Sequence, residues 1–447
     1  MKSSRELKPS RFNIELPLEK MHDGILLVFN TFTQALSLFE SQVWRRIVSG
    51  AQEKDLIPSI EKCRDQMLLV ERNFDETRLL MGRKMEMAYD TGMLSFKAVV
   101  TDHCNFACSY CIEEGYRGKR HMNMTTARQT ANFMVDNIRL YRPHTVALDM
   151  SGGEPLLNIP AMNIIAETVS LFCRGANIPC DISFITNGYL LAPARIHRLI
   201  RAGVNTVRVS LLPRKFHDTL RRDRKGEPTY ERVVANMESI KGEVKFCILS
   251  QYDAENTAFI DAMPAFLRDL ENRGIKESVK EMGVGMILRR EYGLKNADEF
   301  CGDLGEFHNY RAIVDLVRSH GFFVPDGPPG NDCVANHRGR FIIGPEGSLA
   351  SCPTMLDHPE LTVGSVWTGV DPLRKSQIMT RPLPQSCSDE CVLAPRCNGG
   401  CRYQALIRSG SFDEIYCNYD FHMAQLKDYL LRRAEEFLSR AGNRFAA

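Results

Sequence analysis

From about residue 94 to about residue 290, strand-like apolar runs alternate with stretches in which apolar residues recur at helical spacing. Strand-like apolar runs occur at Leu94–Thr101, Thr145–Met150, Cys180–Thr186, Thr206–Leu211, Glu243–Ser250 and Val279–Leu288. Apolar residues recur at helical spacing between them, over Thr125–Leu140, Ile164–Phe172, Pro193–Ala202, Thr229–Ile240 and Thr257–Asn272. This alternation is typical of parallel strands joined by right-handed helical crossovers. Because six repeats are two fewer than a closed eightfold barrel has, we expect an α/β fold with an open, partial (β/α)6 TIM-like barrel over residues 96–300.

The first 95 residues have a different pattern, with short apolar runs grouped before one amphipathic stretch. The strand-like runs are Phe12–Leu16, Gly24–Phe29 and Ala35–Phe39, followed by a helical stretch at Ser41–Val48 and an apolar segment at Met67–Val70. Small strands beside a helix predict an N-terminal α+β module over residues 1–95. Since no cluster of catalytic residue types occurs in it, we expect either a binding or docking module or an architectural cap.

The regular alternation stops near residue 300. The region Gly327–Cys417 is rich in Pro, Gly and Cys and shows only short strands such as Arg340–Ile343, and a charged amphipathic helix is predicted at Phe421–Leu438. A stretch this irregular is hard to hold by apolar burial alone, and bound metal is the usual substitute. The length of 447 residues therefore divides into three predicted domains: 1–95, 96–300 and 301–447.

Composition and charge exclude several classes of partner. Lys plus Arg number 57 and Asp plus Glu number 55, a formal net charge of +2, so nothing indicates a nucleic-acid partner. The longest purely apolar runs, such as Ile25–Phe29, are far shorter than the roughly 20 residues that cross a bilayer. The polar N-terminus lacks the apolar stretch of a secretory signal, and we therefore expect a cytoplasmic protein without a membrane partner.

Fifteen cysteines are the one abnormal feature of the composition. Cys63, Cys173, Cys180, Cys247 and Cys301 are scattered, whereas three lie together at Cys104, Cys108 and Cys111 and seven lie between residues 333 and 417. In a chain without a secretory signal, reducing conditions disfavour disulfides, so clustered cysteines are better explained as metal ligands.

Residue types that carry chemistry fall in the loops that follow the predicted strands. The three-cysteine loop follows the first strand, the text from Ser151 through Gly152, Gly153 and Glu154 to Pro155 follows the second, Asn187 and Gly188 follow the third, and Ser210 closes the fourth. In parallel βα folds these loops meet at one end of the sheet and build the site. The placement predicts one active site at that end.

The three-cysteine loop has the spacing C-x3-C-x2-C over Cys104, Cys108 and Cys111. This spacing lets one loop wrap three thiolates around a [4Fe–4S] cluster, which leaves one iron open because a cubane takes four ligands. A zinc site is the alternative, but His103 is poorly spaced to act as the fourth zinc ligand.

This loop, with Tyr110 before its last cysteine, resembles the signature of the radical S-adenosylmethionine (SAM) enzymes. The resemblance implies that Cys104, Cys108 and Cys111 hold a cluster whose open iron is chelated by the amino and carboxylate groups of SAM. It also implies that SAM is cleaved to methionine and a 5′-deoxyadenosyl radical, which abstracts a hydrogen atom from the substrate. The residues that the resemblance assigns to SAM binding are Tyr110, Gly152, Gly153, Glu154, Asn187, Ser210 and Arg222.

The segment after Ser210 departs from the family pattern, because Leu212 and Pro213 stand where the family usually has Asp-Gly. Arg222 resembles the arginine that grips the SAM carboxylate, for which a guanidinium is geometrically suited. The altered turn leaves Arg221 as the alternative.

Seven ordered cysteines in the C-terminal region resemble the SPASM extension of radical SAM enzymes, which binds two auxiliary [4Fe–4S] clusters. They are Cys333, Cys352, Cys387, Cys391, Cys397, Cys401 and Cys417. The family pattern assigns Cys387, Cys391, Cys397 and Cys417 to a distal cluster and Cys333, Cys352 and Cys401 to a proximal one. A fourth proximal ligand is missing, so either Cys301 or a substrate group completes that cluster. The implied cofactors are three [4Fe–4S] clusters and SAM; a zinc ribbon is the alternative for the tail.

Two SPASM subfamilies compete for the function. Anaerobic sulfatase-maturing enzymes carry an Asp base directly after the second proximal cysteine, where this chain has Pro353. The stretch from Phe29 to Leu36 is similar to the YNTLTGAL text that opens many radical SAM peptide maturases. The resemblance therefore implies a maturase that crosslinks or similarly oxidises a ribosomally made precursor peptide, with flavodoxin or ferredoxin as electron donor. The alternatives are formylglycine formation and a non-catalytic iron–sulfur or zinc protein.

Overall fold

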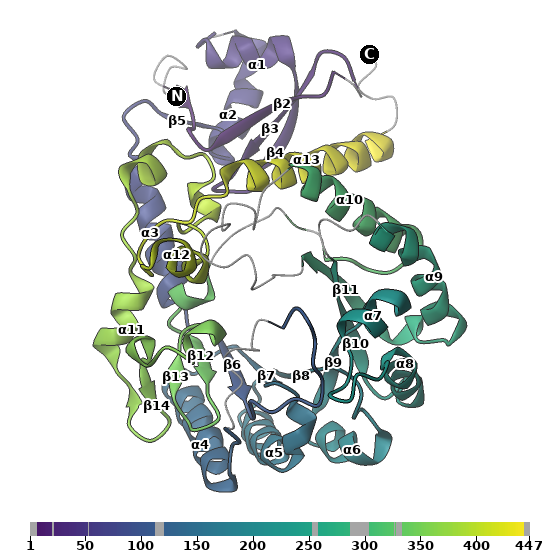
Figure 1. Ribbon diagram of the computed structural model, residues 1–447. Coiled ribbons are helices and arrows are strands. Elements are labelled where there is room, and N and C mark those ends of the chain that lie inside the picture. The colour runs from purple at the N-terminus through teal and green to yellow at the C-terminus, as the bar shows by residue number, and fades with distance from the viewer. Residues whose placement is uncertain are drawn as a thin grey trace. The chain divides into compact units, whose positions relative to one another are not determined.

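The computed structural model describes residues 7–19, 22–51, 53–111, 120–252, 258–286, 304–325, 327 and 333–441 (Figure 1). The chain divides into two compact units. The barrel unit comprises Tyr89–Pro325 and Val334–Thr380, and the terminal unit comprises Met1–Ala88, Asp326–Cys333 and Arg381–Ala447. Both ends of the chain thus contribute to one unit. The division into three domains, 1–95, 96–300 and 301–447, remains a prediction from the sequence.

The barrel unit is built on one sheet, in which all six predicted strands are present. They are β6 (Met93–Val99), β7 (Thr145–Ser151), β8 (Cys180–Thr186), β9 (Val204–Ser210), β10 (Lys245–Tyr252) and β11 (Val279–Met286), and each pairs in parallel with the next. Two strands extend this sheet beyond the prediction: β12 (Arg340–Ile343) pairs in parallel with β6, and β13 (Leu349–Ala350) pairs antiparallel with β12. The strand order is β11-β10-β9-β8-β7-β6-β12-β13. The α/β partial barrel is therefore confirmed and is two strands wider than expected.

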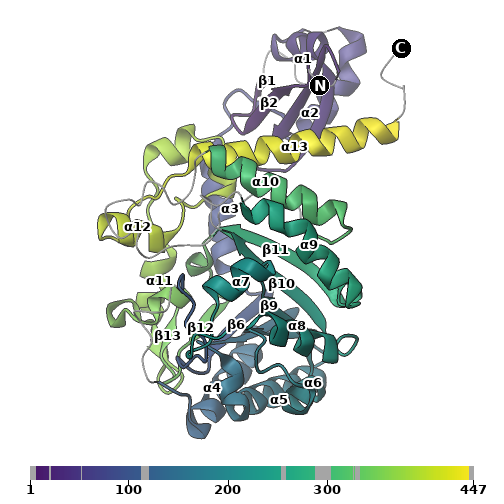
Figure 2. The same ribbon diagram turned by 45° about the vertical axis from the view of Figure 1, so that its right-hand side comes forward.

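Helices cover the outer face of the curved sheet, as Figures 1 and 2 show. The predicted ones are α4 (Met124–Tyr141), α5 (Ile159–Gly175), α6 (Pro193–Arg201), α8 (Tyr230–Ser239) and α9 (Ala258–Asn272). Their starts follow ordinary rules: Asn123 caps α4 by accepting a hydrogen bond from the N–H of Thr126 at 2.8 Å, and α6 begins at a proline. Helices α7 (Arg214–Leu220) and α10 (Leu304–Ser319) of this unit are among those that were not predicted.

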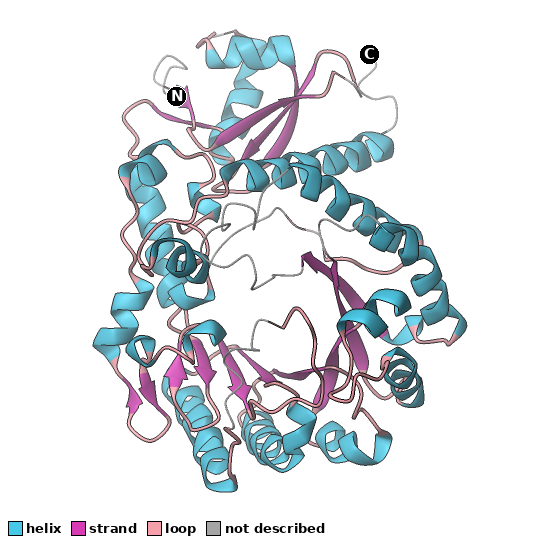
Figure 3. Cartoon of the chain, viewed as in Figure 1, coloured by secondary structure: helices cyan, strands magenta, loops and turns pink. Residues whose placement is uncertain are grey.

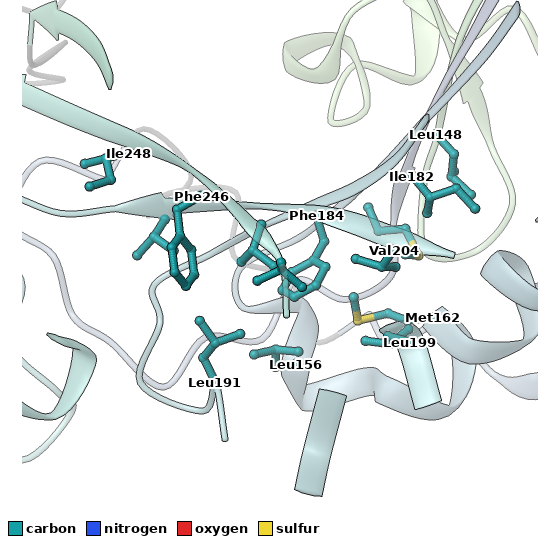
Figure 4. Packing of buried hydrophobic residues seen from close by; sticks show 14 of the residues in the cluster. Leu148, Leu156, Met162, Ile182, Phe184, Leu191, Leu199, Val204, Phe246 and Ile248 are labelled. Atoms are coloured by element: carbon teal, nitrogen blue, oxygen red, sulfur yellow. The ribbon is translucent and has the colours of Figure 1, made fainter. Parts of the chain in front are cut away.

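An apolar core fills the space between the sheet and these helices (Figure 4). Phe184 on β8 and Phe246 on β10 are fully buried there, together with Met162 and Leu199 from α5 and α6. Burying each such side chain stabilises the fold by about 1.5–3 kcal/mol. By length and composition alone the helical stretch Pro155–Gly175 could cross a membrane, but 56% of its apolar window is buried in this fold. Its apolar character is explained by its place in the core.

The terminal unit contains a small antiparallel sheet of order β2-β3-β4, with β2 at Asn13–Pro17, β3 at Ile25–Asn30 and β4 at Leu36–Glu40. Strand β3 is buried along its whole length. Its alternate side chains Leu26 and Val28 pack with Trp44 of α1 (Ser41–Val48), whereas Leu27 and Phe29 pack in the cluster that includes residues of α13 (Tyr419–Ala441). Helix α13 runs beside this sheet in Figure 1. The predicted N-terminal strands and first helix are confirmed.

Further elements complete the two units, and Figure 3 distinguishes them by type. In the terminal unit they are β1 (Leu7–Pro9), which pairs with β5 (Leu69–Glu71), α2 (Ile57–Asp65), α3 (Glu76–Tyr89, whose last residue lies in the barrel unit) and α12 (Arg402–Ser409). In the barrel unit they are the hairpin of β14 (Gly364–Ser365) and β15 (Gly369–Val370), and α11 (Pro372–Met379). Short helical turns lie at Lys54–Leu56, Pro155–Asn158, Lys276–Ser278, Val334–Asn336, Pro353–Met355, Pro359–Leu361, Ser386–Glu390 and Ala394–Arg396.

Candidate functional site

The three-cysteine loop follows β6 at the carboxyl end of the parallel strands. Cys104 and Cys108 are buried and Cys111 is half-buried. The N–H of Phe106 donates to the sulfur of Cys104 at 3.4 Å, and the side-chain amide of Asn187 lies 3.9 Å from the same sulfur. Sulfur atoms that receive N–H donors in a buried loop suit thiolates bound to a cluster. The loop therefore fits the predicted three-cysteine ligand set.

A second loop holds the cysteine loop in place. The N–H groups of Ala107 and Ser109 donate to the carbonyls of Arg222 and Leu220 at 2.9 and 3.0 Å. The Nε of Arg224 donates to the carbonyl of Cys104 at 2.6 Å. The segment after α7 thus runs alongside the cysteines and fixes their backbone.

Arg221 and Arg222 directly follow α7, and Arg221 faces the cysteine loop. Its Nη1 donates to the hydroxyl of Tyr110 at 2.7 Å, and the residue is only 6% exposed. Burial alone would lower its pKa, but the opposite influence of Tyr110 and Cys108 raises it above the ordinary arginine value. Within the described part of the chain, Nε of Arg221 has no hydrogen-bond partner. A buried cation beside the cysteines therefore keeps one donor free.

Arg222 is placed differently. It is exposed, and its Nε and Nη1 donate to the carbonyls of Asp218 and Gly226 at 3.1 Å each. These contacts stay within its own turn. Of the two arginines weighed from the sequence, Arg221 is the one that contacts Tyr110.

Gly152 and Gly153 let the loop after β7 approach the cysteine loop closely. A Cβ atom on Gly152 would lie 2.3 Å from the carbonyl oxygen of Thr101, and one on Gly153 would lie 2.5 Å from that of His103. The N–H groups of Gly153 and Glu154 donate to these two carbonyls at 2.9 and 2.8 Å. Both glycines are therefore required by a backbone contact, and these two N–H groups are occupied in holding the loops together.

The Glu154 side chain is fully buried and ties the loops after β7 and β8 together. One carboxylate oxygen accepts from the hydroxyl of Thr186 at 2.8 Å and from the N–H of Leu156 at 3.0 Å, and the other accepts from the N–H of Asn187 at 2.8 Å. Burial raises the pKa of Glu154 to about 7, against the hydrogen bonds from Asn187 and Thr186 that oppose the rise. The carboxyl group thus fixes Asn187, whose side chain reaches Cys104.

Ser210 is the last residue of β9, where it is half-buried and opposite Leu249 of β10. The structure thus places all the residues predicted for SAM binding in the loops or strand ends at the carboxyl end of the sheet. It brings Tyr110 to Arg221 and Asn187 to Cys104, while Arg222 turns away.

Four cysteines of the terminal unit line a single cavity: Cys387, Cys391, Cys397 and Cys417. They are the four that the sequence pattern assigned to one cluster. Their sulfur atoms are close enough to influence one another, and the pKa of Cys387 is raised by burial and then by Cys391, Cys397 and Cys417. Burial raises the pKa of Cys391, against the backbone groups of Leu393 and Ala394, which lower it. This convergence fits a cluster with four thiolate ligands.

The other three tail cysteines are divided between the units. Cys333 and Cys401 belong to the terminal unit and Cys352 to the barrel unit. Cys401 precedes α12, and burial raises the pKa of its thiol, against the backbone groups of Gln404 and Tyr403 at the start of that helix, which lower it. Cys301, the alternative fourth ligand, lies outside the described residues.

In the part of the chain that the structure describes, no three His, Cys, Asp or Glu residues lie close enough to hold a single metal ion.

The open parallel barrel and its three-cysteine loop define an iron–sulfur enzyme that keeps its site at the strand ends. The model of the radical SAM superfamily matches residues 98–250, which include that loop. A probable GTP 3′,8-cyclase of Methanococcus maripaludis is 31% identical over 287 residues, which cover 60% of this chain and 88% of that protein. A GTP 3′,8-cyclase of Pelotomaculum thermopropionicum is 36% identical over 155 residues, 32% of this chain and 40% of that protein. The chain belongs to the radical SAM superfamily.

Solved structures show the same fold. Native anSMEcpe with bound AdoMet and Kp18Cys peptide superposes with a TM-score of 0.60 at 16% identity, over 77% of this chain and 99% of that chain. Streptococcus suis SuiB bound to precursor peptide SuiA gives a TM-score of 0.52 at 14% identity, over 92% of this chain and 98% of that chain. The predicted fold, a radical SAM partial barrel with a cysteine-rich extension, is confirmed.

Proposed function

We propose that this radical SAM enzyme is a SPASM-type maturase that abstracts a hydrogen atom from a ribosomally made precursor peptide. The product would be a crosslink or a related oxidative modification of that peptide. A [4Fe–4S] cluster bound by Cys104, Cys108 and Cys111 would supply the electron that cleaves SAM reductively.

One observation carries the proposal. Inside the terminal unit, side chains of the N-terminal region donate hydrogen bonds to the segments that contain the cysteines of the four-cysteine cavity. Arg11 donates to the carbonyl of Ser388 at 2.6 Å, and Thr31 donates to that of Val392 at 2.5 Å. Nζ of Lys84 donates to the carbonyl of Cys397 at 2.8 Å. A module that docks a peptide would thereby lie against the auxiliary site.

Three residues of the barrel would act on SAM directly or through a neighbour. Arg221 offers a buried guanidinium whose free Nε suits a carboxylate, and this is why we assign it, in place of Arg222, to the SAM carboxylate. Tyr110, held by Arg221, would pack against SAM beside the third cysteine. Glu154 holds Asn187 and thereby sets the distance between the loops after β7 and β8.

Two other functions compete. The similarity to anSMEcpe supports a sulfatase-maturing activity, but Pro353 follows Cys352 where that activity needs an acidic base. The similarity to two GTP 3′,8-cyclases supports GTP as substrate. The longer of the two matches, however, covers only 60% of this chain. We therefore place the peptide first.

We also propose three [4Fe–4S] clusters per chain, a flavodoxin or ferredoxin as electron donor, and a cytoplasmic location without a nucleic-acid or membrane partner. The near-neutral formal charge of +2 supports the absence of a polyanion partner.

The test is an anaerobic reaction of the reconstituted enzyme with SAM, a reductant and a candidate substrate. The candidates are the peptide encoded beside the gene, GTP, and a sulfatase-derived peptide. Mass spectrometry should show 5′-deoxyadenosine together with the loss of two hydrogen masses from the neighbouring peptide alone. Conversion of GTP, or of the sulfatase-derived peptide, would refute the maturase proposal.

A further inference from the structure

The parallel sheet of the barrel unit has two faces that differ in character. Leu148, Phe184 and Phe246 face the helices and are buried in the apolar core (Figure 4). Because successive side chains of a strand point to opposite faces, Asp149, which follows Leu148, and Cys247, which follows Phe246, lie on the other face. This second face is the concave one, on the inside of the partial barrel (Figure 1).

The polar groups on one side of the concave face satisfy one another. Nζ of Lys97 on β6 lies 2.8 Å from one carboxylate oxygen of Asp149 on β7. The other carboxylate oxygen accepts a hydrogen bond from the hydroxyl of Ser183 on β8 at 3.0 Å. The ion pair is thus complete within three neighbouring strands, and its charges cancel.

Arg208 on β9 is a cation of the same face that has no anion beside it. It stands between the core residues Val207 and Val209, so its side chain points to the concave face. It is half-buried, and its Nε is buried without a hydrogen-bond partner in the described chain. It also forms no ion pair with a described carboxylate. Because a buried donor without a partner costs free energy, an anion brought by a ligand would stabilise this position.

Glu281 on β11 does not supply that anion. Arg208 lies in register with Cys247 of β10, and Cys247 lies in register with Glu281. Neighbouring strands are about 4.8 Å apart, so about 10 Å of sheet separates the backbones of the two charged residues. No ion pair joins their side chains in the described chain. The guanidinium of Arg208 is therefore available to a group from outside the protein.

The position of Arg208 is close to the candidate site. It precedes Ser210, the last residue of β9, by two residues and so lies on the same face of the sheet. Two residues of a strand span about 6.6 Å. A group that enters the barrel at the carboxyl end of the strands would meet Arg208 one layer below Ser210. Since we assign the carboxylate of SAM to Arg221, this second guanidinium is left for the substrate.

We propose that Arg208 binds a carboxylate of the peptide substrate inside the barrel and so helps to select the part of the peptide that is modified. A guanidinium can donate two parallel hydrogen bonds to a carboxylate, which fixes its orientation as well as its charge. The carboxylate belongs to an Asp or Glu side chain or to the C-terminus of the peptide. This inference rests on the proposed function, because it takes the substrate to be a peptide.

The test measures the kinetics of peptide modification under anaerobic conditions with saturating SAM. The substrates are the peptide encoded beside the gene and variants of it in which each carboxylate in turn is replaced by an amide. The enzymes are the wild type, Arg208→Met, Arg208→Lys and the control Arg174→Met, which alters an exposed arginine at the end of α5.

We expect Arg208→Met to raise the KM for the peptide by about tenfold or more, with a smaller effect on kcat, because a charge-assisted contact is lost. Arg208→Lys should raise the KM less, and Arg174→Met should leave it unchanged. One amide variant of the peptide should show the same rise with the wild-type enzyme. With Arg208→Met that variant should lose nothing further, since the two changes remove the same contact.

An unchanged KM in Arg208→Met would overturn this inference and leave the proposed function intact. Equal KM values for all the amide peptides with the wild-type enzyme would overturn it as well, whether or not the arginine variants fold. Arg208→Met should bind SAM with the wild-type dissociation constant. A rise in that constant without a change in the KM for the peptide would assign Arg208 to the SAM carboxylate and refute the inference. A wild type that does not modify the peptide would overturn both the inference and the proposed function.

Discussion

Arg221 donates a hydrogen bond of 2.7 Å to the hydroxyl of Tyr110 and so joins two loops of the barrel that lie 111 residues apart. Tyr110 directly precedes the last cysteine of the cluster loop, and Arg221 directly follows α7. The contact places a buried guanidinium next to the three cysteines, with Nε still unpartnered in the described residues. It is the clearest geometric sign of where a carboxylate ligand would bind.

Replacement of Arg221 should weaken SAM binding more than replacement of its neighbour. A charge-assisted hydrogen bond contributes about 1.5–3 kcal/mol, so Arg221→Met should raise the dissociation constant of SAM by at least about tenfold. Arg222→Met removes a similar side chain that bonds only within its own turn, and should leave the constant nearly unchanged. Equilibrium binding of SAM to the anaerobic protein measures both. The reverse order of effects would show that Arg222 holds the carboxylate.

Glu154 should make the stability of the fold depend on pH near neutrality. Its pKa is raised from 4.5 to about 7 by burial, so the native state favours the protonated form. Stability from this group is therefore fully present below about pH 4.5 and is lost as the pH rises to about 7. Relative to Glu154→Gln, which does not ionise, the wild type should lose up to roughly 3 kcal/mol across this range.

Denaturant unfolding of the two proteins at pH 5 and pH 8 measures this difference. If the free energies of unfolding of the wild type and of Glu154→Gln differ by the same amount at both pH values, the three hydrogen bonds to the carboxylate offset its burial. The buried Glu154 would then ionise at its ordinary pKa.

Gly153→Ala should destabilise the cysteine loop. The added Cβ atom would lie 2.5 Å from the carbonyl oxygen of His103, and overpacking of this kind costs about 1–3 kcal/mol. Gly175→Ala, at the end of α5, is a matched control, since no atom lies within 4 Å of its added Cβ. We expect iron retention by the first cluster to fall in the former variant only. Equal retention in both variants would show that the loop after β7 can move away from Thr101 and His103.

Cys391→Ala should remove one auxiliary cluster and spare the first. Cys391 lines the cavity with Cys387, Cys397 and Cys417, so its loss opens that ligand set while leaving the barrel loop intact. Iron content should fall by about four atoms per chain, SAM cleavage should persist, and peptide modification should be lost. Cys173→Ala, which alters a buried cysteine at the end of α5, is the control and should keep all the iron. Unchanged iron in Cys391→Ala would contradict the distal assignment.

Much of the barrel was predictable because each strand carries its own apolar run. All six predicted strands are present, and Cys180–Thr186 and Arg340–Ile343 match β8 and β12 at both ends. The pairing of β12 with β6 was not predictable, since a pattern shows that a strand exists but not its distant neighbour. Helix α3 was missed because only Glu76 and Leu80 of its described residues are buried, which leaves no apolar stripe.

The candidate site was predictable as far as spacing goes. The cysteines and glycines are identified by local motifs, and four of the seven tail cysteines do line one cavity. The choice between Arg221 and Arg222 was not predictable, because adjacent residues at a helix end point in different directions.

The most direct test of the account is the release of 5′-deoxyadenosine by wild-type protein and by Cys104→Ala, measured anaerobically with SAM and a strong reductant. We predict release by the wild type and none by the variant, because we assign Cys104 as one of three ligands of the cluster that would deliver the electron. Continued release of 5′-deoxyadenosine by Cys104→Ala would contradict the assignment of the site.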